Sequence, residues 1–336
     1  MKARERFLKV LAGGAVDRPP VLAANSTATL EQMDRAGASF PGAHRDADLM
    51  ARLASEALAL GLEGVGVPFC QTVELEVLGC EIDFGHDRSA IPGVAKTFQG
   101  LVTAADVRVP ENLLEKGRIP VILKALELLK EEHGDEAPVL GHVRGPFSVA
   151  SRLKGLDKMV MMMLEDPQKV TEFVEATSAV TIEYAGAMLD HGADAVTIEE
   201  MAAAGNILGP DLFQQFVVPS LTKVIKGLKG PVILHICGSS ENILEGMVAT
   251  GAKCLSIDRK TDAKRAVEIV KGRAVLMGNI DASKTLGYEG PEAVRRETLE
   301  ALEAGLDIIA PGCLLSPVTS SESIGAMVEA VVGYKK

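Results

Sequence analysis

The chain has 336 residues, of which 47% are apolar and 24% are charged, and its formal net charge is −11. This composition is typical of a soluble globular protein with a sizeable core. The acidic balance disfavours nucleic acid or an anionic membrane as the main partner, because both require a basic surface. It remains compatible with docking to another protein.

The N-terminal sequence and the cysteine content indicate the cellular compartment of the protein. The first apolar stretch is interrupted by Lys9 and lacks the pattern of a secretory signal. No segment reaches the roughly 18 uninterrupted apolar residues of a membrane span. Five cysteines without a dense disulfide pattern are typical of free thiols in a reducing compartment. The sequence therefore predicts a cytoplasmic protein that does not enter a membrane.

Strand-like apolar runs alternate with amphipathic helical patterns from one end of the chain to the other. The runs span residues 20–26, 64–68, 138–145, 194–200, 231–238, 254–259, 274–281 and 307–313. This alternation indicates a parallel sheet covered by helices. Eight units favour a closed (β/α)8 TIM barrel over an open doubly wound sheet. No Gly-x-Gly-x-x-Gly fingerprint follows the first strand, which disfavours a dinucleotide fold.

Two segments lie outside the repeat. Residues 1–19 have the pattern of an N-terminal helical extension, and residues 70–110 alternate like an antiparallel hairpin with long loops. We interpret 70–110 as an insertion after the second strand that lies over the barrel mouth. Nothing resembles a linker between independent domains, so residues 1–336 are predicted to form one domain. Four methionines between Met159 and Met163 favour core packing of a helix over a pocket lining.

The strand "PVILHICG" ends on an imidazole and a thiol. His235 and Cys237 are two residues apart and therefore point to the same side of their strand. The last strand ends "APGC", which brings Cys313 to the same rim, where barrel enzymes carry their catalytic residues. One nitrogen and two thiolates suit Zn²⁺, which keeps three protein ligands when it is catalytic. We expect a zinc site there.

The competing interpretation is that these residues are ordinary core side chains, since a lone buried His or Cys is usually structural. Convergence of all three at carboxyl ends of strands is what favours a metal. Cys70, after the second strand, is a reserve ligand. Cys254 opens the sixth strand at the opposite end of the barrel, where a buried apolar role is expected.

With these motifs in view, the chain resembles the uroporphyrinogen decarboxylase superfamily, and within it the zinc-dependent methylcobamide:coenzyme M methyltransferases. The resemblance extends over the full length and includes "PVILHICG", "APGCLLSP", "HVRGPFSVASRLKG" and "MGNID". The decarboxylases carry an arginine-rich segment after the first strand, whereas this chain has "AANSTATLEQM", which contains no arginine or lysine. That departure favours the methyltransferase branch.

The resemblance implies transfer of a methyl group from a corrinoid protein to a thiol, with coenzyme M as the acceptor. The implied cofactors are Zn²⁺ and a methylcobamide carried by the partner. Three alternatives remain open. One is a methyltransferase that demethylates a small methyl donor onto a corrinoid protein. The second is a decarboxylase of a porphyrinogen or related acid, and the third is a barrel that binds zinc or its partner without catalysis.

Positions at the ends of predicted strands suggest roles for residues beyond the three zinc ligands. Glu200, at the end of the fourth strand, is expected to act catalytically, either as the fourth zinc ligand or through a hydrogen bond to a ligand. His142 and Arg144 share a strand face and are expected to hold an anionic tail of the thiol. Asn279 and Asp281 share a face at the end of the seventh strand and are expected to line the substrate site.

Overall fold

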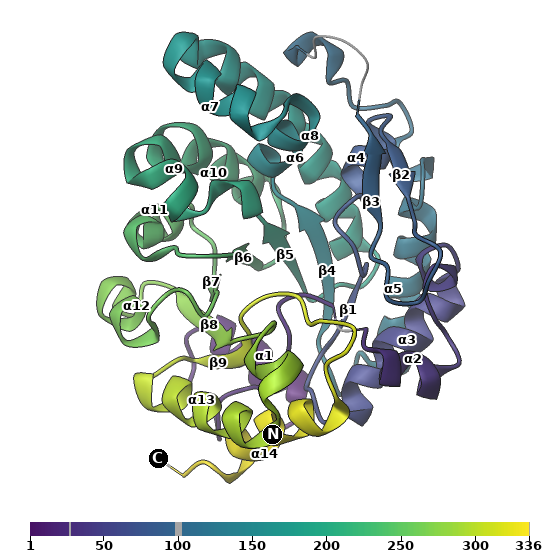
Figure 1. Cartoon of the computed structure of the whole chain (residues 1–336), viewed down its shortest axis with the longest axis vertical. Coiled ribbons are helices and arrows are strands. Elements are labelled where there is room, and N and C mark those ends of the chain that lie inside the picture. Colours follow the sequence, from purple (N-terminus) through teal and green to yellow (C-terminus); the bar gives the residue numbers. More distant parts are fainter. Residues whose placement is uncertain (27, 98–102, 336) are drawn as a thin grey trace.

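A computed structural model describes residues 1–26, 28–97 and 103–335 as an α/β fold built around a curled sheet of seven parallel strands (Figure 1). In spatial order the strands are β1 (Val65–Val67), β4 (Val139–Arg144), β5 (Ala195–Glu199), β6 (Val232–Ile236), β7 (Cys254–Ile257), β8 (Val275–Ile280) and β9 (Ile308–Pro311). Each strand pairs with the next in parallel register. All of their carboxyl ends therefore lie at one edge.

These seven strands were predicted from the sequence, but the prediction of a regular strand over residues 20–26 was wrong. The segment makes one parallel bridge, between Val21 and Ile309. Leu22 donates its backbone N–H to Ile309, and Val21 accepts from the N–H of Glu63. Pro20 has no N–H to donate to a ladder, and the chain bends over residues 24–25. A regular strand therefore does not extend from the bridge.

Helices connect the strands, and most of them cover the outer face of the sheet. The label α marks α-helices, and η marks short 3-10 or π-helical segments. Those before β5 are α1 (Ala3–Leu11), α2 (Leu30–Ala36), η1 (Gly42–His44), α3 (Ala47–Ala59), α4 (Val73–Val77), η2 (Ala104–Asp106), η3 (Leu113–Glu115), α5 (Ile119–His133), α6 (Pro146–Lys154), α7 (Leu156–Glu165) and α8 (Pro167–Asp190). Those after β5 are η4 (Met201–Ala203), α9 (Gly205–Leu212), η5 (Phe213–Val217), α10 (Val218–Gly227), η6 (Glu241–Ile243), α11 (Leu244–Ala249), α12 (Ala263–Val270), η7 (Thr285–Glu289), α13 (Pro291–Ala304) and α14 (Ser321–Gly333).

Local sequence signals account for several helix ends. The 24-residue α8 begins at Pro167, directly after Asp166, whose carboxylate accepts a hydrogen bond from the N–H of Lys169. A side-chain cap followed by proline at the first helical position is a strong start signal. A different helix, α13, shows a typical end signal. It ends at Ala304, and the next residue, Gly305, adopts φ +94°. Glycine adopts this left-handed conformation without the steric cost that a Cβ brings.

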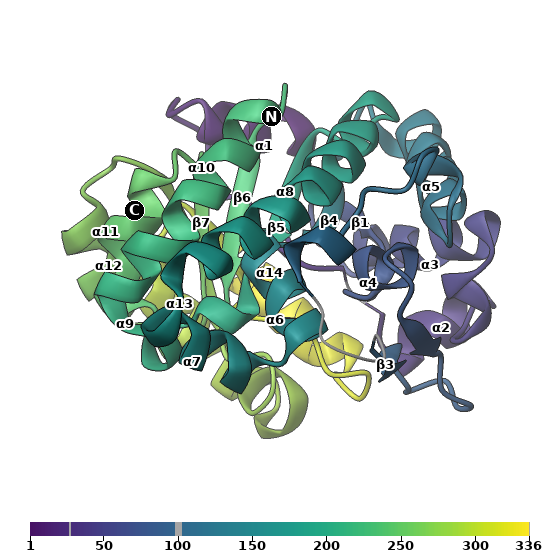
Figure 2. The same cartoon turned by 90° about the horizontal axis from the view of Figure 1, so that it is seen from above.

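The N-terminal helix closes one end of the sheet's interior. Phe7, Val10 and Leu11 of α1 pack against inward-facing residues of the strands, and together they form a separate apolar cluster. The strand residues of this layer are Leu22, Ala24, Leu140, Ala195, Ile233, Cys254, Met277, Ile308 and Ala310. Figure 2 shows α1 on one side of the sheet and α6, α7 and α9 on the other. The apolar floor therefore leaves the opposite, carboxyl edge for polar chemistry.

We expect Phe7→Ala to lower the free energy of unfolding by about 3–5 kcal/mol, the usual cost of deleting a buried phenyl ring. Phe7 is fully buried, whereas Lys9 of the same helix is exposed. The measurement is urea unfolding followed by circular dichroism, with Lys9→Ala as the control. A change below about 1 kcal/mol, the usual limit for surface sites, would show that α1 is not an integral part of the core.

Residues 70–110 contain the predicted hairpin, and they also contain α4. The antiparallel strands are β2 (Glu81–Asp83) and β3 (Gly93–Lys96). Residues 98–102, which were predicted to continue this segment, lie outside the described residues. The connection between the two strands reaches α2, because Arg88 pairs with Asp34 and donates to the carbonyl of Leu30. None of the described helices is both long enough and apolar enough to cross a lipid bilayer.

Candidate metal centre

Three soft ligand atoms converge at the carboxyl edge of the sheet, as the sequence predicted. The His235 Nε2 and Cys237 Sγ atoms are 3.1 Å apart, and the Cys237 and Cys313 Sγ atoms are 3.0 Å apart. All three ligand atoms lie within 4.8 Å of one another. His235 is fully buried and both thiols are half-buried. The site is therefore recessed but accessible from the carboxyl side.

Neighbouring residues fix the orientation of this cluster. Ser256, on the adjacent strand β7, lies with its Oγ 3.0 Å from His235 Nδ1, which leaves Nε2 to face the thiols. Gly238 has φ +82°, so the chain turns sharply just after Cys237. The carboxylate of Asp258 accepts from the Gly238 N–H at 3.0 Å and holds that turn. These contacts fix the positions of the imidazole and the first thiol.

The hydrogen bond between the two thiols moves their pKa values in opposite directions. The hydrogen bond with Cys237 lowers the pKa of Cys313 to about 5, with further help from the imidazole of His235 and opposition from burial. The same hydrogen bond, together with burial, raises the pKa of Cys237. One sulfur is therefore readily available as a thiolate, which is the form that binds metals.

The donor set fits Zn²⁺. Zinc binds histidine nitrogen at about 2.0–2.1 Å and cysteine sulfur at about 2.3 Å, so tetrahedral ligand atoms lie about 3.3–3.8 Å apart. The distances of 3.0 and 3.1 Å found here need to open by less than about 1 Å to accept the ion. Three protein ligands of this type leave a fourth coordination position open, which is the pattern of a catalytic site.

Glu199 is a further candidate residue, to which the sequence analysis assigned no role. In the parallel register Glu199 of β5 lies directly beside His235 of β6, so both side chains point into the sheet's interior. Glu199 is 2% exposed and its Oε2 has no hydrogen-bond partner among the described residues. Burial raises the pKa of Glu199 to about 8, the charge of Cys313 adds to this rise, and the charge of His235 opposes it.

Glu200 points the opposite way. Its carboxylate accepts from the backbone N–H groups of Phe147 at 3.2 Å and Ser148 at 2.5 Å, in the first turn of α6. Burial raises the pKa of Glu200 to about 7, although these hydrogen bonds oppose the shift. The structure therefore places the predicted catalytic carboxylate on the helix-facing side of β5, outside the three-residue cluster. A carboxylate at a helix N-terminus also benefits from the helix dipole.

The two residues expected to bind the acceptor's tail lie on β4 but have different surroundings. His142 Nδ1 is 2.6 Å from the Oγ of Ser26, and burial lowers the pKa of His142 to about 4, so the ring is neutral at pH 7. Arg144 donates from Nε to the carbonyl of Gln71. Burial lowers the pKa of its guanidinium, and the nearby charges of Glu74 and Glu199 oppose that shift. Arg144 is in register with Glu199. Of the two residues, only Arg144 therefore brings a positive charge to this layer.

The two residues expected to line the substrate site at the end of β8 differ in their hydrogen bonding. Asn279 is 1% exposed, donates from Nδ2 to the carbonyl of Thr261, and keeps an Oδ1 that accepts no hydrogen bond from the described residues. Asp281 instead accepts from the backbone N–H groups of Ser283 and Lys284 and closes the turn after the strand. The structure thus leaves a free acceptor on Asn279, whereas the carboxylate of Asp281 is engaged by its own loop.

The remaining cysteines do not join the cluster. Cys254 is fully buried in the apolar layer beneath α1, as expected for a structural residue. Cys70 is buried, and its Sγ accepts a hydrogen bond from the Nη1 of Arg118 at 3.1 Å. Neither belongs to the group of described side chains that could hold a metal ion.

A curled parallel sheet with an imidazole and two thiols at its carboxyl edge defines an α/β protein with a candidate soft-metal centre. A sequence profile described as "Uroporphyrinogen decarboxylase (URO-D)" matches residues 2–334. The chain belongs to this family. Its resemblance to the family, predicted from the motifs, is thereby confirmed.

Similar proteins narrow the branch. A Methanosarcina barkeri protein named "Methylcobamide:CoM methyltransferase MtaA" is 35% identical over 97% of this chain and 96% of its own length. A "Methylated-thiol--coenzyme M methyltransferase" of Methanosarcina mazei is 30% identical over 98% of this chain and 89% of its own length. A solved structure of a "methyltransferase from Methanosarcina mazei" has a TM-score of 0.94 at 35% identity, covering 99% of this chain and 98% of that one. These relatives confirm the prediction of a methyltransferase.

Proposed function

We propose that this chain transfers a methyl group from a methylated corrinoid protein to a thiol acceptor, with Zn²⁺ held by His235, Cys237 and Cys313. The convergence of these three ligand atoms within 4.8 Å is the observation that carries the proposal. The names of the relatives favour a methylcobamide as the donor and coenzyme M as the acceptor.

In the proposed reaction the acceptor sulfur attacks the methyl carbon. A sulfur–carbon bond forms as the cobalt–carbon bond breaks, both electrons of the broken bond stay on cobalt, and the product is cob(I)amide. The thiol proton leaves for solvent. When bound, Zn²⁺ would supply the charge that keeps the acceptor sulfur deprotonated at neutral pH. The protein's own contribution is a recessed site with an oriented imidazole.

We further propose roles for the carboxylates. Glu199 faces the cluster with an unpartnered oxygen, which suits a fourth ligand that leaves when the thiol arrives. Glu200 stays a proposed participant, but in a positioning role, since it holds the start of α6. His142, Asn279 and Asp281 remain predicted lining residues, and the unpartnered Asn279 Oδ1 is the best placed of them to meet a substrate.

Activity with free methylcobalamin tests the proposal. We expect the purified, zinc-loaded protein to convert methylcobalamin and coenzyme M into cob(I)alamin and the methylated thiol, with the reaction followed anaerobically by absorbance. Chelator-treated protein serves as the control. Absence of thiol-dependent conversion by the loaded protein would contradict the proposed function.

A second candidate is demethylation of a methylated thiol onto the corrinoid protein, which the Methanosarcina mazei relative favours by name. The same cluster would then bind the leaving sulfur, where a metal can act as a Lewis acid. Incubating cob(I)alamin with a methylated thiol, in the absence of coenzyme M, separates the two. If methylcobalamin forms from cob(I)alamin and the methylated thiol faster than it is consumed in the assay with coenzyme M, demethylation of the thiol is the favoured reaction.

We expect Arg144→Ala to weaken binding of an anionic acceptor by about tenfold or more. A charge-assisted hydrogen bond to a bound anion contributes about 1.5–3 kcal/mol, and about 1.4 kcal/mol corresponds to a factor of ten. Apparent KM values for coenzyme M and for a neutral thiol of similar size provide the test. Equal losses for both thiols would make Arg144 structural, and no loss would direct attention to Arg259 or Lys260 after β7.

We propose in addition that the seven strands and the segment at Val21 form a closed eight-stranded barrel, with residues 70–110 over its mouth. The hydrogen bonds from Leu22 to Ile309 and from Glu63 to Val21 support closure, because they join this segment to both edges of the sheet. A single domain over residues 1–336 and a cytoplasmic location without nucleic-acid partners stay predictions.

A further inference from the structure

The turn that follows Cys237 has its peptide groups bonded away from the metal cluster. Gly238 donates its N–H to the carboxylate of Asp258 at 3.0 Å, and its carbonyl accepts from the Oγ1 of Thr261 at 3.3 Å. Ser240 donates its N–H to the same Oγ1 at 2.9 Å. Within the described residues, no backbone N–H donates to the Cys237 sulfur, whose hydrogen-bonding neighbours are the other two proposed ligands. The connection that follows β7 therefore holds this turn from outside the cluster.

The strand β7 and the connection after it contact all three segments that carry proposed ligands. Ser256 of β7 lies beside His235, with its Oγ 3.0 Å from Nδ1. Asp258 holds the turn after the second ligand. Gly312, directly before the third ligand, packs so closely on this connection that a Cβ there would lie 3.3 Å from the Cα of Asp258 and 2.9 Å from the next backbone nitrogen. None of these contacting residues belongs to the described group that could hold a metal, so they position the ligands without adding one.

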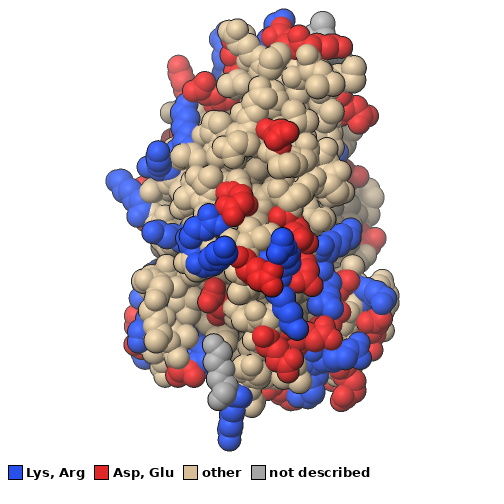
Figure 3. All heavy atoms as spheres, turned by 90° about the vertical axis from the view of Figure 1, so that its left-hand side faces the viewer, with Lys and Arg blue, Asp and Glu red and all other residues tan. Residues whose placement is uncertain are grey.

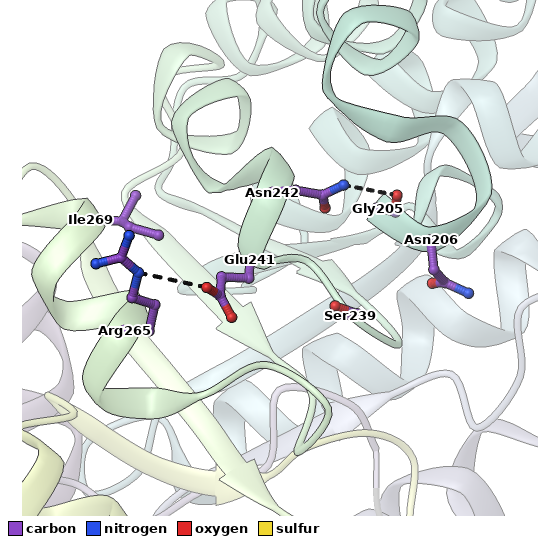
Figure 4. A pocket seen from close by; sticks show the side chains of 7 residues that line it. All are labelled: Gly205, Asn206, Ser239, Glu241, Asn242, Arg265 and Ile269. Carbon is purple, nitrogen blue, oxygen red and sulfur yellow. Dashed lines mark hydrogen bonds and ion pairs between the residues drawn. The ribbon is translucent and has the colours of Figure 1, made fainter.

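The connections after β6 and β7 also meet at the surface, where their contacts are exposed. Figure 4 shows a hollow of about 380 Å³ beside them, in which Arg265 of α12 pairs with Glu241 of η6 at 3.6 Å. Figure 3 shows positive and negative side chains interspersed on the side of the molecule that carries α11 and α12. Exposed ion pairs contribute little to holding a structure together. Asp258 is half-buried and Thr261 is fully buried, so the hydrogen bonds of these two residues hold the turn more firmly.

The direction of the Gly238 N–H matters for the chemistry of the neighbouring thiolate. A hydrogen bond to a thiolate stabilises its negative charge, and the sulfur then donates less charge to a bound metal. A metal that receives less charge from its ligands withdraws more from the acceptor sulfur, which becomes a weaker nucleophile. The Gly238 N–H belongs to the residue directly after Cys237, so it is the natural donor to that sulfur if nothing else binds it. Asp258 accepts this N–H and keeps it from the sulfur.

We propose that Asp258 is a positioning residue that withholds the Gly238 N–H from the Cys237 sulfur, with Thr261 holding the carbonyl of the same glycine. The proposal rests on the proposed function, because it concerns the metal that the three ligands would hold. Asp258 acts only through Cys237. It keeps this sulfur electron-rich, so that the metal is bound tightly and the acceptor sulfur stays nucleophilic.

The test measures zinc affinity and the absorption spectrum of the Co²⁺-substituted protein. We expect Asp258→Ala to bind zinc about 10–100-fold more weakly, which is the usual effect of losing a residue that orients a metal ligand. The sulfur-to-cobalt charge-transfer band should move to shorter wavelength, because the Cys237 thiolate then accepts the Gly238 N–H and holds its electrons more tightly. Asp258→Asn keeps an acceptor oxygen for this N–H and should restore both quantities to the wild-type values.

Asp262→Ala is the matched control, since it makes the same change on the same connection. Asp262 accepts the N–H of Arg265 at 2.7 Å and caps α12, and none of its described hydrogen bonds reaches the turn after Cys237. Loss of this cap should lower the unfolding temperature. It should leave the zinc affinity and the cobalt spectrum unchanged.

Thr261→Val keeps the test decisive if Asp258→Ala does not fold. It removes the hydroxyl that binds the Gly238 carbonyl, so it should weaken zinc binding and shift the cobalt band in the same direction. Unchanged zinc affinity and an unchanged band, in whichever of these two variants folds, would overturn the positioning role.

Two further results would also overturn it. Equal losses in Asp258→Ala and Asp258→Asn would show that the charge of the carboxylate acts, rather than its hydrogen bond. A loss in Asp262→Ala as large as that in Asp258→Ala would show a general loosening of the connection. Failure of the wild-type protein to bind zinc contradicts the proposed function itself, so the two failures are distinguishable.

Discussion

Cys237→Ala and Cys313→Ala are each expected to lose most of the one zinc ion per chain while remaining folded. Losing a residue that merely orients a metal ligand costs about 10–100-fold in affinity, so losing a ligand should cost more than about 100-fold. The fold should persist because the apolar layer beneath α1 and the larger core do not include these thiols as buried members. Elemental analysis after gel filtration and circular dichroism measure the two effects.

Cys254→Ala is the matched control for this prediction. It also removes a thiol from a strand of the sheet, but at the apolar floor rather than at the carboxyl edge. It should keep its zinc and lose stability, because it creates a small buried cavity. Full zinc retention in both Cys237→Ala and Cys313→Ala would contradict the ligand assignment.

Glu199→Gln and Glu200→Gln should have different effects on zinc affinity and on stability, although the two residues are adjacent. Glu199 faces His235 and is proposed as an exchangeable fourth ligand. Because glutamine keeps a neutral oxygen donor at that position, Glu199→Gln should weaken zinc binding by only about 10–100-fold. Glu200 accepts two backbone N–H bonds at the start of α6, so Glu200→Gln should leave zinc bound and lower stability by about 1–3 kcal/mol. Competition with a zinc-binding dye and thermal unfolding give the two quantities.

Other outcomes for these two variants would contradict the assignment of Glu199 as the fourth ligand. If Glu200→Gln loses zinc and Glu199→Gln keeps it, the original expectation of Glu200 as the fourth ligand is correct and the register argument fails. If both variants keep zinc with wild-type affinity, neither carboxylate is a ligand. A solvent oxygen would then be the natural fourth donor in the absence of thiol.

The sequence predicted seven strands because buried parallel strands appear as short apolar runs between amphipathic helices. It failed at residues 20–26, where the run is apolar but Pro20 cannot donate to a ladder and the following residues bend. It also did not reveal α4 (Val73–Val77), since a five-residue helix is too short to show a period. The two errors arise from the shortness of α4 and from the position of Pro20, rather than from the composition of these segments.

The site was predictable where strand alternation was applied and missed where it was not. His235 and Cys237 were placed on one face by their spacing of two. The same rule puts Ala195, Thr197 and Glu199 on the inner face of β5, with the apolar Val196 and Ile198 facing the helices.

That pattern was present in "AVTIEE" and identifies Glu199, not Glu200, as the residue that faces inward. The hydrogen bonds of Asp281 to its own loop are tertiary details that no sequence pattern indicates.

The most direct test of the account is X-ray absorption spectroscopy at the zinc edge of the purified protein, with and without the acceptor thiol. The account predicts a shell of two sulfurs at about 2.3 Å, with nitrogen and oxygen completing the site. Addition of coenzyme M should raise the sulfur count from two to three and displace an oxygen. An unchanged two-sulfur shell in the presence of saturating thiol would contradict the claim that this cluster activates the methyl acceptor.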